Sequence, residues 1–145
     1  EIVASEVADF VGIRVARTRP LSMISEEYFT MTEALLAAPT MVEGQSGYLL
    51  TIFHSSKEFI SVVEFVPGII LQGLPGQEAL KRPGLQQLME DVGRLVALDC
   101  LLNNGDRVPA IWMNDGNLTN VMITASSAVV GIDQQVHPIL DNEGM

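Results

Sequence analysis

Two short apolar segments near the end of the chain, residues 120–124 and 128–132, constrain the fold more than any other feature. Both are rich in β-branched residues, and they flank the turn sequence at 125–127. This pattern predicts two antiparallel strands joined as a hairpin. Because a hairpin returns its last residue to the side of its first, Asn120 and Asp133 are expected to meet at its open end.

A long helix is predicted before this hairpin, because apolar residues recur at helical spacing over residues 84–102. Asp99 lies on the same apolar stripe, where an unpaired carboxylate is unfavourable. Two alternatives are open for it. Either it accepts hydrogen bonds from backbone amides of residues 103–105, or the helix is rotated so that Asp99 is exposed. After the helix, a polar loop carries Asp106 and Arg107 toward the open end of the hairpin.

Asp106, Asn120 and Asp133 together offer two carboxylates and one amide oxygen. Oxygen ligands of this kind are what a hard divalent cation such as Mg²⁺ takes from protein, with phosphate and water completing its coordination. Asp and Asn are also common in turns, so ordinary turn residues are the alternative interpretation. The order of the three residues and the apolar strands between them favour the metal site.

The same region resembles the catalytic segment of the actin-fragmin kinases, atypical protein kinases that are distantly related to the lipid-kinase-like group. The resemblance is carried by Asp-Arg-x-Pro at 106–109, Gly-Asn-x-x-Asn at 116–120 and Gly-Ile-Asp-Gln at 131–134. In ordinary protein kinases a catalytic Asp, an Asn and the Asp of Asp-Phe-Gly follow in this order. The resemblance implies an α+β, protein-kinase-like fold that is incomplete in this chain.

The resemblance also implies a role for each polar residue. Asp106 would be the catalytic residue that orients the acceptor hydroxyl, and Arg107 would steady its loop or approach a phosphate. Asn120 and Asp133 would hold Mg²⁺ or Mn²⁺ on ATP. Glu1 stands at the position that pairs with the phosphate-binding lysine of kinases, although a solvated terminal carboxylate is an equal alternative.

A second set of residues is implied to bind the adenine of ATP. A strand predicted over residues 59–65 is ended by the Pro-Gly pair at 67–68. In the resemblance this break is the hinge between the kinase lobes, and its backbone groups hydrogen-bond the adenine edge. The residues so implied are Val63 at the back of the pocket, followed by Glu64, Phe65 and Val66. The alternative is an ordinary strand end with a turn.

The other expected elements are short and alternate in type. They are a helix over 1–11, a strand over 13–21 that ends at Pro20, a helix over 25–38 capped by Ser25, a hairpin of strands 48–54 and 59–65, and an irregular connector over 69–83. The first helix should bury Val3, Val7 and Phe10. We expect one partial kinase-like domain, with an N-lobe portion at 1–66 and a C-lobe portion at 67–145.

Charge and composition limit the partners. The chain of 145 residues has 18 acidic and 8 basic side chains and a net charge of −10, which disfavours nucleic acids and anionic membrane surfaces. No uninterrupted apolar run approaches the roughly 20 residues that span a bilayer. The one cysteine, Cys100, excludes an internal disulfide and is expected to be buried. These features predict a cytoplasmic protein.

Three functional hypotheses follow. The first is an ATP-dependent protein kinase core that transfers the γ-phosphate to Ser or Thr hydroxyls, with actin as the candidate protein substrate. The second is a catalytically incompetent scaffold, because no glycine-rich phosphate loop is recognised in the sequence. For that reason the chain alone is expected to be inactive. The third is a lipid kinase, which the lack of a basic patch disfavours.

Overall fold

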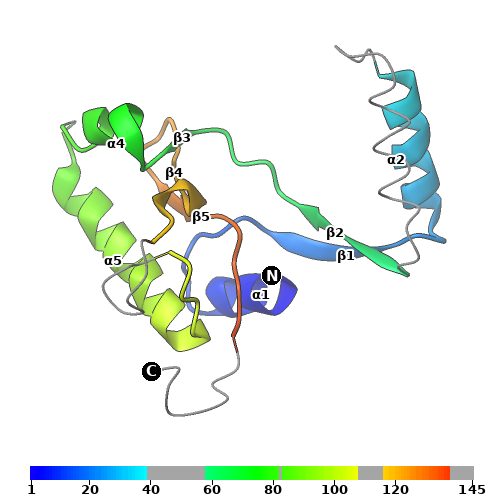
Figure 1. The fold of residues 1–145 in the computed structure, drawn as a ribbon, viewed down its shortest axis with the longest axis horizontal. Helices are drawn as coiled ribbons and strands as arrows, with labels where there is room; N and C mark the ends of the chain where they lie inside the picture. Colours follow the sequence, from blue (N-terminus) through cyan, green and yellow to red (C-terminus); the bar gives the residue numbers. More distant parts are fainter. Residues whose placement is uncertain (39–57, 82, 108–115, 138–145) are drawn as a thin grey trace. The chain divides into compact units, whose positions relative to one another are not determined.

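The computed structural model describes residues 1–38, 58–81, 83–107 and 116–137 (Figure 1). The chain divides into two compact units. The larger comprises Glu1–Arg17 and Glu64–Met145, and the smaller comprises Thr18–Val63. The division into lobes at residue 66 remains a prediction, and the predicted strand over 48–54 lies outside the described residues.

The described residues of the smaller unit form a two-stranded antiparallel sheet and one helix. Strand β1 (Thr18–Ser22) pairs with β2 (Phe59–Val63), and Pro20 lies opposite Ser61. Pro20 therefore lies inside the strand that it was expected to end. Among the described residues β1 pairs on one side only, where a residue without an N–H is tolerated.

Helix α2 (Glu26–Ala37) confirms the predicted helix in this unit. The Ser25 side chain accepts a hydrogen bond from the Tyr28 N–H at 3.2 Å, and Glu26 and Glu27 lie in the first turn. Their carboxylates favour the positive end of the helix dipole.

The larger unit contains a three-stranded antiparallel sheet in the order β3-β4-β5. Its strands are β3 (Ile69–Ile70), β4 (Val121–Ile123) and β5 (Val129–Gly131), and the 3₁₀ helix η1 (Leu118–Asn120) leads into β4. The predicted hairpin is confirmed: Met122 lies opposite Val130. Its turn is closed by the Ser127 N–H, which donates to the Thr124 carbonyl at 2.9 Å.

Three helices accompany this sheet: α1 (Ile2–Phe10), α4 (Gly73–Ala79) and α5 (Leu85–Leu102). The structure confirms α5 within one residue of its predicted start. The interpretation of 69–83 as irregular was wrong, because β3 pairs with β4 and α4 follows it. Pro75 is tolerated in the first turn of α4, where an N–H has no partner within the helix. No helix in the described ranges is both long and apolar enough to cross a membrane.

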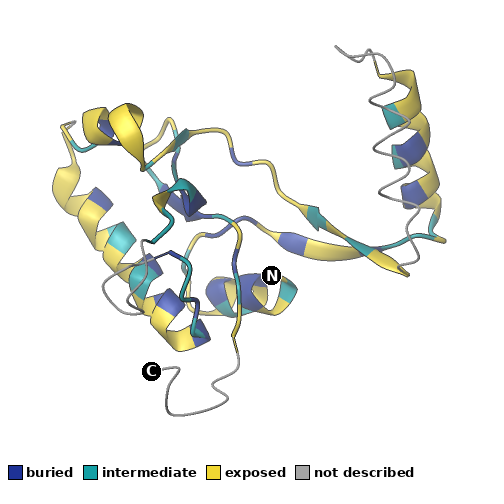
Figure 2. Ribbon diagram, in the orientation of Figure 1, coloured by how far each residue is buried: buried dark blue, intermediate teal, exposed yellow. Residues whose placement is uncertain are grey.

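The core of the larger unit lies where α5 packs against the sheet and α1 (Figure 2). Its buried side chains include Leu88, Leu95, Leu98 and Leu102 of α5, Val121, Ile123 and Val129 of the sheet, and Ala4 and Ala8 of α1. Each large apolar side chain buried in this way contributes roughly 1.5–3 kcal/mol before entropy is subtracted. This packing holds the end of α5 beside the hairpin.

Two expectations about buried faces need correction. Helix α1 buries Ala4 and Ala8, and Val7 packs partly buried against the core as expected, whereas Val3 is 65% exposed and Phe10 is 91% exposed. The two alanines share a face at i and i+4, and their small side chains let the helix backbone approach the core. Cys100 is exposed because the residue before it, Asp99, occupies the inward face of α5.

Candidate active site

The loop that carries Asp106 begins with a reversal at the end of α5. Asn103 adopts the left-handed conformation, with φ of 52°, and the Asn104 N–H donates to the Asp99 carbonyl oxygen at 2.8 Å. Asn is one of the few side chains other than Gly that tolerates this conformation. Asn103 also joins the chain after β5, because its side-chain amide donates to the His137 carbonyl at 3.2 Å.

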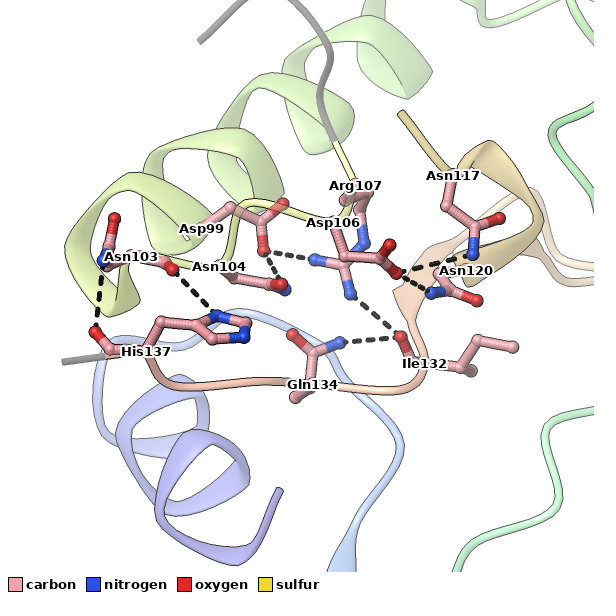
Figure 3. A network of polar contacts seen from close by, with 10 residues as sticks. All are labelled: Asp99, Asn103, Asn104, Asp106, Arg107, Asn117, Asn120, Ile132, Gln134 and His137. Atoms are coloured by element: carbon pink, nitrogen blue, oxygen red, sulfur yellow. Dashed lines mark hydrogen bonds and ion pairs between the residues drawn. The ribbon is translucent and has the colours of Figure 1, made fainter. Parts of the chain in front are cut away.

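Asp99 and Arg107 form a buried ion pair beneath this loop (Figure 3). Asp99 Oδ1 accepts hydrogen bonds from Arg107 Nη1 and, at 3.0 Å, from Asn104 Nδ2. Burial raises the pKa of the Asp99 carboxyl, and the Arg107 guanidinium opposes that rise. Asp99 is 0% exposed, so the exposed alternative is wrong. Its side-chain partners are Arg107 and Asn104 rather than the expected backbone amides.

The Arg107 side chain is committed to holding the loop. Its second terminal nitrogen, Nη2, donates to the Ile132 carbonyl oxygen at 2.9 Å. Together with the bond to Asp99, this contact uses both ends of a guanidinium that is 1% exposed. Of the two roles expected for Arg107, steadying the Asp106 loop is therefore the one that its geometry supports.

Asp106 faces the hairpin rather than the core (Figure 3). Its Oδ2 atom accepts hydrogen bonds from Asn120 Nδ2 at 2.8 Å and from Asn117 Nδ2 at 3.4 Å. The Asn117 N–H also donates to the Arg107 carbonyl at 3.2 Å. Two neighbouring residues thus serve different purposes, since Arg107 anchors the loop and Asp106 presents a half-buried carboxylate at the end of the hairpin.

Asn120 and Asp133 lie at the open end of the hairpin, as the strand pattern predicts. The Ile132 N–H donates to the Asn120 carbonyl at 2.9 Å, and Asp133 follows Ile132 directly. Asp133 is exposed and has φ of 54°, so the chain turns out of the strand at this residue. The structure therefore brings Asp106 into contact with Asn120 and places Asp133 one residue beyond the Asn120–Ile132 pair.

Glu1 lies against Asp133. Partial burial of the Glu1 carboxyl, followed by a hydrogen bond to the Asp133 carboxyl and charge repulsion from it, raises the pKa of Glu1. Two carboxyl groups that share a site favour either a shared proton or a bound cation. The resemblance gave Glu1 the position that pairs with the phosphate-binding lysine. The structure places its carboxyl beside that of Asp133, and the pairing with a lysine stays a prediction.

The oxygen donors near this corner are of the kinds that a hard divalent cation takes. Within the described ranges, no group of three or more His, Cys, Asp or Glu side chains is arranged to hold a metal. The candidate ligands instead combine one amide oxygen with carboxylate oxygens. Asn120 turns its Nδ2 toward Asp106, and no hydrogen bond to its Oδ1 is found among the described residues. That amide oxygen and the carboxylates of Asp106 and Asp133 are the ligand types that Mg²⁺ takes when phosphate completes its coordination.

The predicted hinge is anchored by an exposed ion pair. Both Glu64 carboxylate oxygens accept hydrogen bonds from Arg14, and one also accepts from the Arg17 N–H at 3.1 Å. The hydrogen bonds from Arg14 and then from the Arg17 backbone lower the pKa of Glu64. Within the described part of the chain, neither the Glu64 carbonyl oxygen nor the Val66 N–H has a hydrogen-bond partner.

The side chains of the predicted hinge differ in their surroundings. Val66 is buried, whereas Phe65 is 87% exposed. Val63 is 44% exposed and ends β2 in the smaller unit. Adenine binding at residues 63–66 stays a prediction.

The sequence analysis did not identify the buried contacts that hold the Asp106 loop and the chain after β5 in place. Asp99 was recognised as an unusual carboxylate on an apolar stripe, but its pairing with Arg107 was not predicted. Gln134, which is 2% exposed and donates to the Ile132 carbonyl at 3.4 Å, was not singled out. The available signal was the isolated Asp on the buried face of α5 followed by one Arg in the next loop.

Comparison with known proteins yields two matches. A family model described as "Actin-fragmin kinase, catalytic" matches residues 1–138. A protein of Dictyostelium discoideum that carries the name "Putative actin-fragmin kinase" is 26% identical over 124 residues. That alignment covers 84% of this chain and 29% of the relative, so the chain spans less than a third of the relative's length.

Proposed function

Because this chain belongs to the actin-fragmin kinase catalytic family, we propose that it provides the nucleotide-binding and phosphoryl-transfer residues of an ATP-dependent protein kinase. Family membership and the mixed helices and small antiparallel sheets confirm the predicted α+β, kinase-like fold. The activity, substrate and partners of the whole protein are proposals.

The observation that carries this proposal is the contact between Asp106 and Asn120, with Asp133 following at the same hairpin end. Phosphoryl transfer needs the γ-phosphate, the cation and the acceptor hydroxyl to be held in line while charge is neutralised. Asp106 would accept or orient the proton of the acceptor hydroxyl, which typically contributes 10²–10⁴ in rate. Asn120 and Asp133 would hold Mg²⁺ or Mn²⁺, which supplies positive charge beside the phosphate oxygens.

The hinge would bind the adenine. The Glu64 carbonyl would accept from the adenine amino group and the Val66 N–H would donate to a ring nitrogen; among the described residues neither group has a hydrogen-bond partner. The ion pair between Glu64 and Arg14 holds this segment against the strand-like chain at 13–17.

The substrate is proposed at two levels. A Ser or Thr hydroxyl on a protein is the acceptor that Asp106 would serve. Actin is the candidate protein, because the names of the family and of the relative both contain it. We place the protein in the cytoplasm on the grounds of its single cysteine.

A kinase-like scaffold without activity is the second candidate. It is favoured by one observation: Glu1 faces Asp133, and no lysine of the described residues pairs with it. The sequence has lysine only at positions 57 and 81, and Lys81 pairs with Glu78.

Transfer of labelled γ-phosphate from ATP to purified actin tests the proposal, with the natural full-length protein and MgCl₂. The Asp106→Asn variant should lose at least 100-fold in rate while it still binds nucleotide, and Asp133→Asn should lose Mg²⁺-dependent nucleotide binding. Asp91→Asn, at a half-buried position of α5 eight residues before Asp99, is the matched control. Transfer that survives in Asp106→Asn would contradict the assignment, and absence of transfer from the unmodified protein would favour the scaffold.

A further inference from the structure

A buried polar cluster lies beneath the loop that carries Asp106 (Figure 3). Its members are Asp99 and Asn104, each 0% exposed, Arg107, 1% exposed, and Gln134, 2% exposed. They come from three segments: the last turns of α5, the loop after it, and the chain that follows β5. The cluster therefore connects the segment of Asp106 to the segment of Asp133.

The Ile132 peptide is the point at which this connection is made. Its carbonyl oxygen accepts hydrogen bonds from Arg107 Nη2 at 2.9 Å and from Gln134 Nε2 at 3.4 Å. Its N–H donates to the Asn120 carbonyl at 2.9 Å. Asp133 follows Ile132 directly in the chain. A displacement of the Arg107 guanidinium would therefore also move the backbone of Asp133.

Asp99 determines where that guanidinium lies. Its Oδ1 atom binds Arg107 Nη1 and also the Asn104 side-chain amide at 3.0 Å. A side chain as long as Arg has many rotamers, and a buried carboxylate on a rigid helix selects one of them. The position of the Arg107 guanidinium thus depends on Asp99, and the position of the Ile132 carbonyl depends on Arg107.

Stability alone is a poor explanation for this cluster. Four of its buried atoms have no hydrogen-bond partner among the described residues: Asp99 Oδ2, Asn104 Oδ1, Arg107 Nε and Gln134 Oε1. Buried polar atoms without partners destabilise a fold. Apolar residues of similar volume commonly replace a buried ion pair with no loss of stability, or with a gain. The pair is better suited to fixing a geometry than to holding the domain together.

We propose that Asp99 is a positioning residue that orients Arg107, so that the Asp106 loop and the Asp133 segment keep the spacing that phosphoryl transfer requires. This inference rests on the proposed kinase function. The side-chain partners of Asp99 are Arg107 and Asn104, and Asp99 is not among the residues proposed to bind substrate or cation. It acts through Arg107 and the Ile132 peptide.

The test replaces the pair by apolar residues of similar volume, Asp99→Leu with Arg107→Met, in the natural full-length protein. The melting temperature should be unchanged or higher, and the Kd for the fluorescent nucleotide TNP-ATP with MgCl₂ should stay within threefold. The rate of phosphate transfer should fall at least 100-fold, because small misplacements of reacting groups have effects of that size. Hydrogen exchange of residues 131–137 should become faster.

Two further variants complete the design. Asp99→Asn keeps the shape of the side chain and a hydrogen-bond acceptor for Arg107, so it should fold and lose about tenfold in kcat with little change in Kd. Asp91→Asn with Arg94→Met removes a partly exposed ion pair of the same helix and should keep transfer within twofold of the unmodified protein.

The outcomes separate the two proposals. Normal transfer and normal exchange in the apolar double variant, with an active unmodified protein, would overturn the positioning role of Asp99. A double variant that unfolds, together with Asp99→Asn at full kcat, would make the pair a stability element and would overturn it too. If the unmodified protein transfers no phosphate but exchange at 131–137 responds to the double variant, the kinase function fails while the coupling of the two segments stands.

Discussion

Substitution of Gly131 by Ala should destabilise the protein, because there is no room for a methyl group at the end of β5. A Cβ atom at this position would lie 2.5 Å from Gln134 Nε2 and 2.8 Å from Leu95 Cδ1. Favourable contacts between heavy atoms require roughly 3.5–4.0 Å. Both neighbours are buried, so neither can move away without disturbing others. Overpacking of this kind costs about 1–3 kcal/mol.

Gly93→Ala is the matched control for this prediction. Gly93 lies inside α5, and a Cβ atom added there meets nothing within 4 Å. Alanine stabilises a helix interior by roughly 0.5–1 kcal/mol relative to glycine. The free energy of unfolding, measured by urea denaturation with far-UV circular dichroism, should therefore fall for Gly131→Ala and rise for Gly93→Ala. Equal stability of Gly131→Ala and the unmodified protein would refute the close packing of Gln134 and Leu95 around β5.

Three further predictions concern charge and capping. Arg14 lowers the pKa of Glu64 below its usual 4.5, so the contribution of this ion pair is present above pH 4.5 and is lost as pH falls through the lowered pKa. Thermal melts of Glu64→Gln should accordingly show a smaller loss of stability on acidification. The pKa of Glu1 is raised above 4.5, so its contribution to stability is present below pH 4.5 and is lost as pH rises through the raised value. Glu1→Gln should melt higher than the unmodified protein at pH 7 without Mg²⁺ and equally at pH 4, and a lower melting point at pH 7 would contradict the repulsion from Asp133. Ser25→Ala removes the cap of α2 and should lower stability by about 1 kcal/mol in urea denaturation, which an unchanged midpoint would disprove.

Features with a strong local pattern were predicted correctly. The hairpin was recognised because two segments rich in β-branched residues flank the turn sequence at 125–127, and register then follows from the turn itself. Helix α5 was recognised because its apolar residues keep helical spacing from Leu88 to Leu102. The positions of Asn120 and Asp133 followed from the hairpin alone.

Features that depend on tertiary contact were predicted less well. The two residues of β3 form a strand only because β4 lies beside them, and two residues carry no periodicity. The buried face of α1 was misassigned because the prediction followed its large apolar residues. In the structure the helix packs closely against the core through the small side chains of Ala4 and Ala8. The partner of Asp99 was missed because nothing in a sequence orients an Arg in a loop.

The hydrogen bond from the Asn117 N–H to the Arg107 carbonyl, at 3.2 Å, bears on how many residues can separate these two positions in other members of the family. The bond from Asn120 to Asp106 at 2.8 Å joins the same two segments. Lengthening a stretch of chain whose ends are already joined adds little entropic penalty. Insertions or deletions between Arg107 and Asn117 should therefore leave the Asp106–Asn120 contact in place, so the number of residues between this Asp and its Asn partner can change while the two side chains still meet.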